Sequence, residues 1–269
     1  MPSISEQISE AEIIFFDDFT SETLDRSMWN VEITGPVYNS EQQAYIDSAE
    51  TLYIEKQEDA NGTLVIHPRY CPGFVTSEGK TFDFVSGRIN TMGKVEFMYG
   101  SIAARMKLPV GAGLWPAFWA MGSAKPWPEN GEIDIMENVG DPSWTNVAMH
   151  GPGYSGDTPL VHRKSLPQGN DVTGWHVYSV EWTRDCLLFK TDGELSYHVT
   201  RSMVAKHGPW TYDNDKFILL NCALGGVYPA SVNGIQSPYL GIPESTVQVI
   251  KENQARVLID WVRVTRTEG

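Results

Sequence analysis

Three acidic residues, Glu132, Asp134 and Glu137, stand close together towards the end of the segment 127–138, which reads WPENGEIDIMEN. Glu132 and Asp134 are two positions apart, so in a strand both side chains point to one face and the intervening isoleucines to the other. Glu137 joins that face only if the strand carries one extra residue, a β-bulge near residues 135–136. Bulges are common beside active sites because they re-aim a side chain. The segment therefore predicts a bulged strand carrying a set of three carboxyl groups.

Three carboxyl groups on one face cannot all ionise cheaply, so at least one pKa should be raised. A raised and an ordinary carboxyl group side by side are what an acid and a nucleophile acting on a glycosidic bond require. Residues two apart on a strand are about 7 Å apart at the backbone. A bulge could bring the carboxyls of Glu132 and Glu137 to roughly 5 Å, the separation found in retaining glycosidases. A solvated acidic strand face and a calcium cluster remain as alternatives, although strands disfavour Asp and Glu.

Most of the secondary structure around these acids is expected to be strand. The chain has many runs of alternating apolar and polar residues between turn residues, and few helix signals. The segments after residue 176 favour a meander with a turn at Asp192-Gly193. The expected strands are Ile13–Phe16, Ser101–Leu108, Val177–Trp182, Leu187–Thr191, Ser196–Val199, Phe217–Asn221 and Val257–Val264. The expected helices are Ser202–His207 and Glu244–Asn253.

The composition limits the classes of protein to which this chain can belong. The chain has 269 residues, 41% of them hydrophobic, and a formal net charge of −14. The anionic balance argues against nucleic acid as a partner, and no apolar run is long enough for a membrane span. We expect one domain over residues 1–269, an all-β, two-sheet antiparallel sandwich. Residues 1–11 read as a polar N-terminal extension without the apolar stretch of a signal peptide.

The carboxylate segment and its surroundings resemble glycoside hydrolase family 16. The hallmark of that family is Glu-x-Asp-x-x-Glu on a bulged strand, which here reads Glu-Ile-Asp-Ile-Met-Glu. The form with the extra residue is that of the laminarinase, agarase and carrageenase branches. Further similar segments span nearly the whole chain, and they are GLWPAFW ending at Trp119, YGSIAARMKLP from Tyr99, SGRI from Ser86, HGPGYS from His150, WHVYSVEW from Trp175, NCALGG from Asn221 and NSEQQAY from Asn39.

The resemblance implies a concanavalin-like β-jelly-roll sandwich with an open concave cleft for a polysaccharide. It assigns Glu132 as the nucleophile, Glu137 as the acid/base and Asp134 as an assisting residue between them. The chemistry is double displacement, which needs no cofactor. Spacing alone does not decide which glutamate plays which role.

Residues around the acids are expected to contact sugar. Trp115 and Trp127 each precede a proline, which favours an extended or loop backbone and a place in the cleft. Trp119 lies in an apolar run, where core packing and substrate contact are both open. The resemblance adds five further contacts, which are His150 in a loop at the cleft, Arg88, Asn39, Glu41 and Asn221. Ser40 replaces an asparagine of the family pattern.

Some relatives hold a structural calcium ion, and residues at comparable places here are Asp17, Gly62 and Asp260. A capping or salt-bridging role for Asp260 is the alternative. The expected function is an endo-1,3-β-glucanase acting as a monomer on laminarin-type β-glucan. The alternatives are activity on mixed-linkage glucan or on a galactan such as agarose, and a non-catalytic glucan-binding lectin. A polysaccharide substrate favours a secreted or periplasmic protein.

Overall fold

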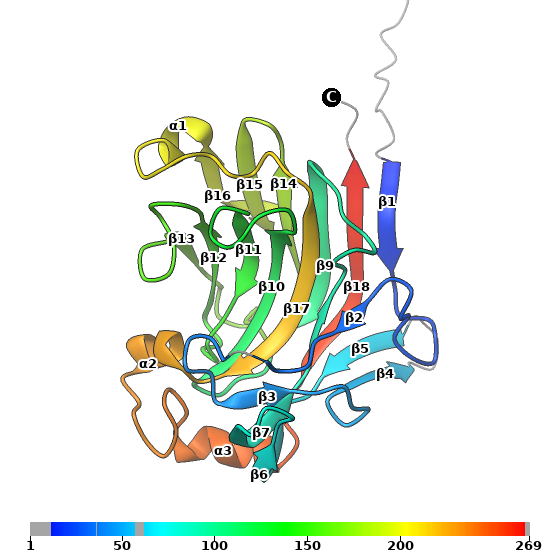
Figure 1. Cartoon of the computed structure of the whole chain (residues 1–269), viewed down its shortest axis with the longest axis vertical. Helices are drawn as coiled ribbons and strands as arrows, with labels where there is room; N and C mark the ends of the chain where they lie inside the picture. The colour runs from blue at the N-terminus through cyan, green and yellow to red at the C-terminus, as the bar shows by residue number, and fades with distance from the viewer. Residues whose placement is uncertain (1–11, 36, 57–61, 267–269) are drawn as a thin grey trace, which may run out of the picture.

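The structure is a computed structural model that describes residues 12–35, 37–56 and 62–266. The predicted extension at residues 1–11 lies outside this range. Two large antiparallel sheets pack against each other, and a small third sheet lies at one end (Figure 1). The predicted all-β, two-sheet antiparallel sandwich is therefore confirmed, with the small sheet as an addition.

The first large sheet has the strand order β16-β15-β14-β9-β18-β5-β4, and β1 also pairs with β18 (Figure 1). Its strands β14, β15 and β16 form the predicted meander. The members of this sheet are β1 (Glu12–Asp17), β4 (Leu52–Lys56), β5 (Gly62–Ile66), β9 (Gly100–Lys107), β14 (His176–Trp182), β15 (Cys186–Thr191), β16 (Glu194–Thr200) and β18 (Val257–Arg266).

The second large sheet has the order β13-β12-β11-β10-β17-β8-β2 and carries the three acids near its middle. Its members are β2 (Asn30–Val31), β8 (Arg88–Asn90), β10 (Leu114–Gly122), β11 (Glu132–Glu137), β12 (Trp144–His150), β13 (Leu160–Ser165) and β17 (Lys216–Leu224). The small sheet pairs β3 (Gln43–Tyr45) in parallel with β7 (Thr81–Ser86), and β7 with β6 (Arg69–Val75).

Period-two alternation explains why these segments are strands. In β14 the buried side chains are His176, Tyr178, Val180 and Trp182, and the residues between them are partly exposed. Such faces from both large sheets meet in one core cluster. The face of the second sheet turned away from that core is called the site face below, because it carries Glu132, Asp134 and Glu137.

The helices differ more from expectation than the strands do. The predicted helix at Ser202–His207 is observed only as the short α1 (Arg201–Val204), and the second prediction corresponds to α3 (Glu244–Lys251). No residue pattern described above predicts α2 (Val227–Asn233), which begins after two glycines. None of the helices in the described ranges has the length and hydrophobicity that a membrane-crossing helix needs.

Candidate active site

Strand β11 contains the predicted bulge. Met136 lies opposite Phe118 of β10 and Asp134 lies opposite Trp119, so Ile135 has no partner on β10. Ile135 and Met136 both point into the core. The extra residue restores the alternation, and Glu137 rejoins the face of the other two acids. The partners of Glu132, Asp134 and Glu137 on β10 are Met121, Trp119 and Ala117, which are alternate residues of one face.

The chain enters β11 through a turn that only glycine fits. Gly131 has φ +69°, and a Cβ there would lie 2.3 Å from the carbonyl oxygen of Thr211. The carbonyl of Asn130 accepts a hydrogen bond of 2.6 Å from Nζ of Lys216, a buried lysine. Burial lowers the pKa of Lys216 to about 7. These contacts fix the backbone immediately before Glu132.

Glu137 is held through both of its carboxyl oxygens. Oε1 accepts a hydrogen bond of 2.9 Å from the indole Nε1 of Trp115, and Oε2 accepts one of 3.0 Å from Nδ2 of Asn146. Burial raises the pKa of Glu137, and these two donors oppose that rise because they favour the ionised form. These two hydrogen bonds hold the carboxyl group of Glu137 in position. Because they oppose the effect of burial on its pKa, the group can both take up and release a proton.

Glu132 is held by a single indole. Its Oε2 accepts a hydrogen bond of 2.5 Å from Nε1 of Trp127, whose side chain is 47% exposed. Burial, and then the charge of Asp134, raise the pKa of Glu132 to about 8, whereas His150 and the Trp127 hydrogen bond lower it. Glu132 therefore keeps a proton to unusually high pH in the free protein.

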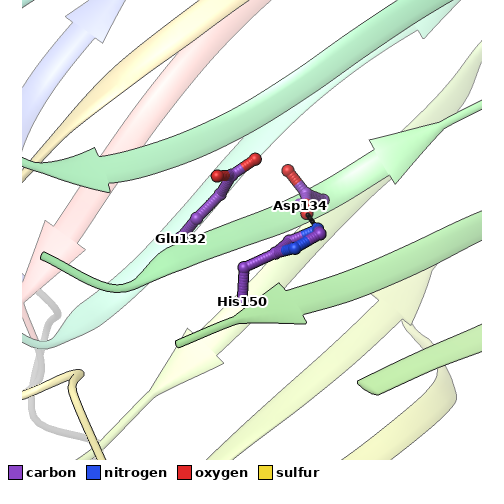
Figure 2. Close-up of side chains that lie close together, drawn as sticks. All are labelled: Glu132, Asp134 and His150. Atoms are coloured by element: carbon purple, nitrogen blue, oxygen red, sulfur yellow. Dashed lines mark ion pairs between the residues drawn. The ribbon is translucent and has the colours of Figure 1, made fainter. Parts of the chain in front are cut away.

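Asp134 is the most deeply buried of the three acids, with 3% exposure. Burial and the charge of Glu137 raise its pKa well above the ordinary value. Figure 2 shows Asp134 and Glu132 projecting from one strand and His150 from its neighbour, with Asp134 Oδ2 3.3 Å from His150 Nε2. That oxygen accepts no hydrogen bond from the described residues. Glu132 and Asp134 both have raised pKa values and interact directly, so the pair retains a proton more readily than two separate carboxyl groups would.

The same residues could be considered as a metal site, because ligand atoms of Glu132, Asp134 and His150 lie within 4.8 Å of one another. His150 Nδ1 accepts a hydrogen bond of 3.2 Å from the backbone N–H of Gly156. In the neutral imidazole the proton then lies on Nε2, the nitrogen that faces Asp134, so this atom has no free lone pair for an ion. The arrangement favours a proton-sharing cluster over a metal centre.

A second group of polar and aromatic residues lies beside the acids on the site face. Trp119 donates its indole N–H to Asn221 Oδ1 at 2.8 Å, and the guanidinium of Arg88 lies 4.9 Å from the Trp119 ring centre. Asn221 donates to the hydroxyl of Tyr45 at 3.2 Å, and that hydroxyl donates to Glu41 at 3.2 Å. Trp119 is therefore part of the site face and not of the core, and its contact with substrate remains a prediction.

His150 and Asn39 are two further residues that were predicted to contact sugar. His150 is the last residue of β12 and pairs with Glu132, so it lies in a strand and not in the expected loop. Asn39 is exposed with φ +51°, and its carbonyl accepts a 2.8 Å hydrogen bond from Val227 N–H at the start of α2. In this structure Asn39 stabilises the backbone of that turn.

The three residues expected to hold calcium lie on the first sheet. Asp17 accepts hydrogen bonds from Trp29 Nε1 at 2.8 Å and from Phe19 N–H at 2.9 Å. Asp260 forms an ion pair of 2.6 Å with Arg105. Because the cation of Arg105 occupies the Asp260 carboxylate, these residues as arranged do not fit a calcium ion. The salt-bridging alternative for Asp260 agrees with the structure.

Two residues of the site, Asn146 and Tyr45, were not among the residues predicted to contact the substrate or the acids, although Tyr45 ends the quoted segment NSEQQAY. Asn146 meets Glu137 only because β12 pairs with β11, and Tyr45 reaches Asn221 only because the small sheet lies against β17. Residues Trp144–His150 are buried almost throughout and do not alternate, so period-two patterning reveals neither β12 nor its register with β11. Neither contact can be derived from spacing along the chain.

Comparisons with known proteins identify relatives of this chain in sequence and in fold. The sequence profile described as Glycosyl hydrolases family 16 matches residues 35–262. A beta-glucanase from Rhodothermus marinus is 29% identical, over 97% of this chain and 87% of that protein. The endo-beta-1,3-glucanase structure from Pyrococcus furiosus has a TM-score of 0.81 and 33% identity, covering 96% of both chains. A beta-1,3-glucan-binding protein from Penaeus monodon is 28% identical over 84% of this chain and 77% of that protein.

Proposed function

The chain belongs to glycoside hydrolase family 16, and from this premise we propose that it is a retaining endo-1,3-β-glucanase that cleaves internal bonds of laminarin-type glucans. The observation that carries the proposal is the bulge at Ile135, which turns Glu137 to the same face as Glu132. The similarity to the endo-beta-1,3-glucanase of Pyrococcus furiosus supports the choice of linkage.

Glu132 acts as the nucleophile and Glu137 as the acid/base. In the first step a Glu132 oxygen bonds to the anomeric carbon while the bond to the glycosidic oxygen breaks, and Glu137 gives its proton to that oxygen. In the second step Glu137 takes a proton from water, the water oxygen bonds to the anomeric carbon, and the bond to Glu132 breaks. Each of the two displacements inverts the anomeric carbon, so its configuration is retained overall.

Asp134 allows Glu132 to be ionised in spite of its raised pKa. The three acids repel one another when all are charged, so the cluster retains a proton at neutral pH. Burial raises the pKa of both Glu132 and Asp134, and their carboxyl groups interact directly, so the reaction requires the form in which Asp134 holds that proton. A neutral Asp134 removes one negative charge from beside the nucleophile and offers it a hydrogen bond.

The aromatic residues of the site face hold the sugar units beside the acids. Trp127 exposes about half of its surface next to Glu132, and Trp115 and Trp119 are partly exposed on β10. Indole rings suit the apolar faces of pyranose rings. Arg88, Glu41 and Asn221 offer polar atoms to sugar hydroxyls in the same region, and Asn39 contributes from the turn at α2.

Two other activities deserve comparison. Cleavage of mixed-linkage glucan or of a galactan such as agarose would use the same acids with different sugar contacts. The beta-1,3-glucan-binding protein from Penaeus monodon makes a lectin function the second alternative. The presence of all three acids on one face favours the enzyme, because a lectin has no use for a cluster whose members repel one another.

A reducing-end assay on laminarin, lichenan and agarose tests the proposal. We expect the highest rate on laminarin, with short oligosaccharides from the first minutes of reaction. Glu132→Gln and Glu137→Gln should each lower kcat on the order of 10³-fold or more, whereas Glu50→Gln, an exposed glutamate elsewhere, should not. Binding of laminarin without cleavage by the wild-type protein would instead support the lectin.

Catalysis needs no cofactor in this scheme, and a structural calcium ion is not part of the proposal because Asp260 is paired with Arg105. A polysaccharide substrate favours a secreted or periplasmic place of action. We expect the protein to act as a monomer, since each chain carries both glutamates.

A further inference from the structure

Three side chains, Trp115, Asn146 and Tyr228, form a closed group with the proposed acid/base Glu137 at the end of β11. Tyr228 donates its hydroxyl proton to Asn146 Oδ1 at 2.8 Å, and Asn146 in turn donates Nδ2 to Glu137 at 3.0 Å. Trp115 donates to the other oxygen of Glu137, and its ring packs edge-on against Tyr228 with 5.1 Å between ring centres. Among the described residues, Tyr228 makes no hydrogen bond to Glu132 or Glu137. It contacts both Trp115 and Asn146, the two residues that donate to Glu137.

The orientation of Asn146 depends on Tyr228. A side-chain amide can face a carboxylate with either its NH₂ or its oxygen, and its hydrogen-bond partners decide which. Asn146 is 2% exposed, so water does not compete for its oxygen. Burial, and then the charge of Glu137, raise the pKa of Tyr228 above its usual range, so the hydroxyl remains a donor. A donor at Oδ1 forces the NH₂ group towards Glu137.

The fold places Tyr228 with little freedom. It is the second residue of α2, and Gly226 before the helix has φ +95°. A Cβ at Gly226 would lie 2.5 Å from the carbonyl of Asn39, so the turn admits glycine alone. The Val227 N–H then donates to that same carbonyl. The turn therefore aims Tyr228 at Asn146.

We propose that Tyr228 is a positioning residue for the reaction, whose hydroxyl holds Asn146 with its NH₂ group directed at the acid/base Glu137. The inference rests on the proposed roles of the glutamates and adds a residue to them. Loss of the hydroxyl frees the Asn146 amide to turn its oxygen towards Glu137, which favours the protonated acid. The other charged groups near Glu137 and Tyr228 are Glu132, Asp134, His150 and Arg163, and none of them is altered by removing that hydroxyl.

Tyr228→Phe tests this role because the ring and its contact with Trp115 remain. The alkaline limb of kcat/KM reports protonated Glu137, and we expect it to move up by about one pH unit. Asn146→Ala should move it in the same direction, and Tyr228→Phe should add nothing further in the Asn146→Ala background. Tyr178→Phe is the matched control, because it removes a buried hydroxyl that has no hydrogen-bond partner in the described chain.

The proposal is wrong if Tyr228→Phe moves the alkaline limb of kcat/KM equally in the wild-type and Asn146→Ala backgrounds. It is also wrong if Tyr228→Phe changes KM and leaves the pH profile unchanged. Thermal unfolding of each variant identifies any that do not fold. The ¹³C carboxyl titration of Glu137 in substrate-free protein, assigned with Glu137→Gln, provides the same test without activity. A protein that cleaves no glucan but shows the carboxyl shift would refute the proposed function and leave the positioning role of Tyr228 standing.

Discussion

Trp127 and Glu132 are joined by a hydrogen bond of 2.5 Å from the indole Nε1 to the carboxyl Oε2. Trp127 is half exposed, whereas the carboxyl group that it reaches is surrounded by Asp134 and His150. One side chain thus offers a ring to a sugar and a proton donor to the proposed nucleophile. The two contributions can be separated by substitution.

Trp127→Phe keeps an aromatic ring and removes the donor. Because the indole hydrogen bond lowers the pKa of Glu132, its loss should raise that pKa and move the acidic limb of kcat/KM to higher pH. We expect kcat/KM to fall about tenfold near neutrality, as for loss of one hydrogen bond to a charged group. Trp210→Phe is the control, because its indole donates to Asp213, away from the three acids. An acidic limb that stays in place would show that Trp127 acts on the sugar alone.

Asp134→Asn replaces the proposed neutral acid with an amide of the same shape. In the free protein the ionised form of Asp134 raises the pKa of Glu132, so this variant should lower that pKa and move the acidic limb of kcat/KM to lower pH. It should keep kcat within about tenfold of wild type, because the amide still offers a donor to Glu132. Asp134→Ala, which has no donor, should lose much more activity. Equal loss in both variants would argue against a proton held at Asp134.

Glu132→Gln should make the protein more stable at neutral pH while abolishing activity. The pKa of Glu132 is raised from 4.5 to about 8 in the folded chain, so the folded state binds this proton more tightly than the unfolded state. Wild-type stability therefore decreases as pH rises from 4.5 towards 8, whereas a glutamine does not ionise. We expect a higher Tm for the variant at pH 8, on the order of 5 °C, and no difference at pH 4. The same Tm difference at both values in calorimetry would contradict this account, and Glu50→Gln provides the baseline.

Calcium should leave the thermal unfolding of the wild-type protein unchanged, because the guanidinium of Arg105 lies 2.6 Å from the Asp260 carboxylate. Scans with added calcium chloride and with EDTA measure this directly. Arg105→Met frees the carboxylate while keeping much of the apolar stem, and a calcium-dependent rise in Tm in that variant alone would identify Arg105 as the competing cation. A rise in the wild-type protein would show that calcium displaces the ion pair.

The pattern of residues along the chain predicts the strands well, because a strand buried on one face must alternate apolar and polar residues. The meander from His176 to Thr200 and the bulge near Ile135 follow from that alternation. Helix α2 could not be found in this way. Its seven residues include a proline and have two glycines before them, and contacts with Asn39 place it.

Residue types at short spacing are enough to predict the three acids, the bulge that their common face requires and the family of the chain. The groups that meet those acids follow from the three-dimensional packing. Pairing of β12 with β11 brings Asn146 to Glu137, and the glycine turn before α2 brings Tyr228 to Asn146. Arg105 on β9 reaches Asp260 on the paired strand β18. A pKa depends on burial and on neighbours within a few ångströms in space, and such neighbours come from register and packing between segments far apart in the chain.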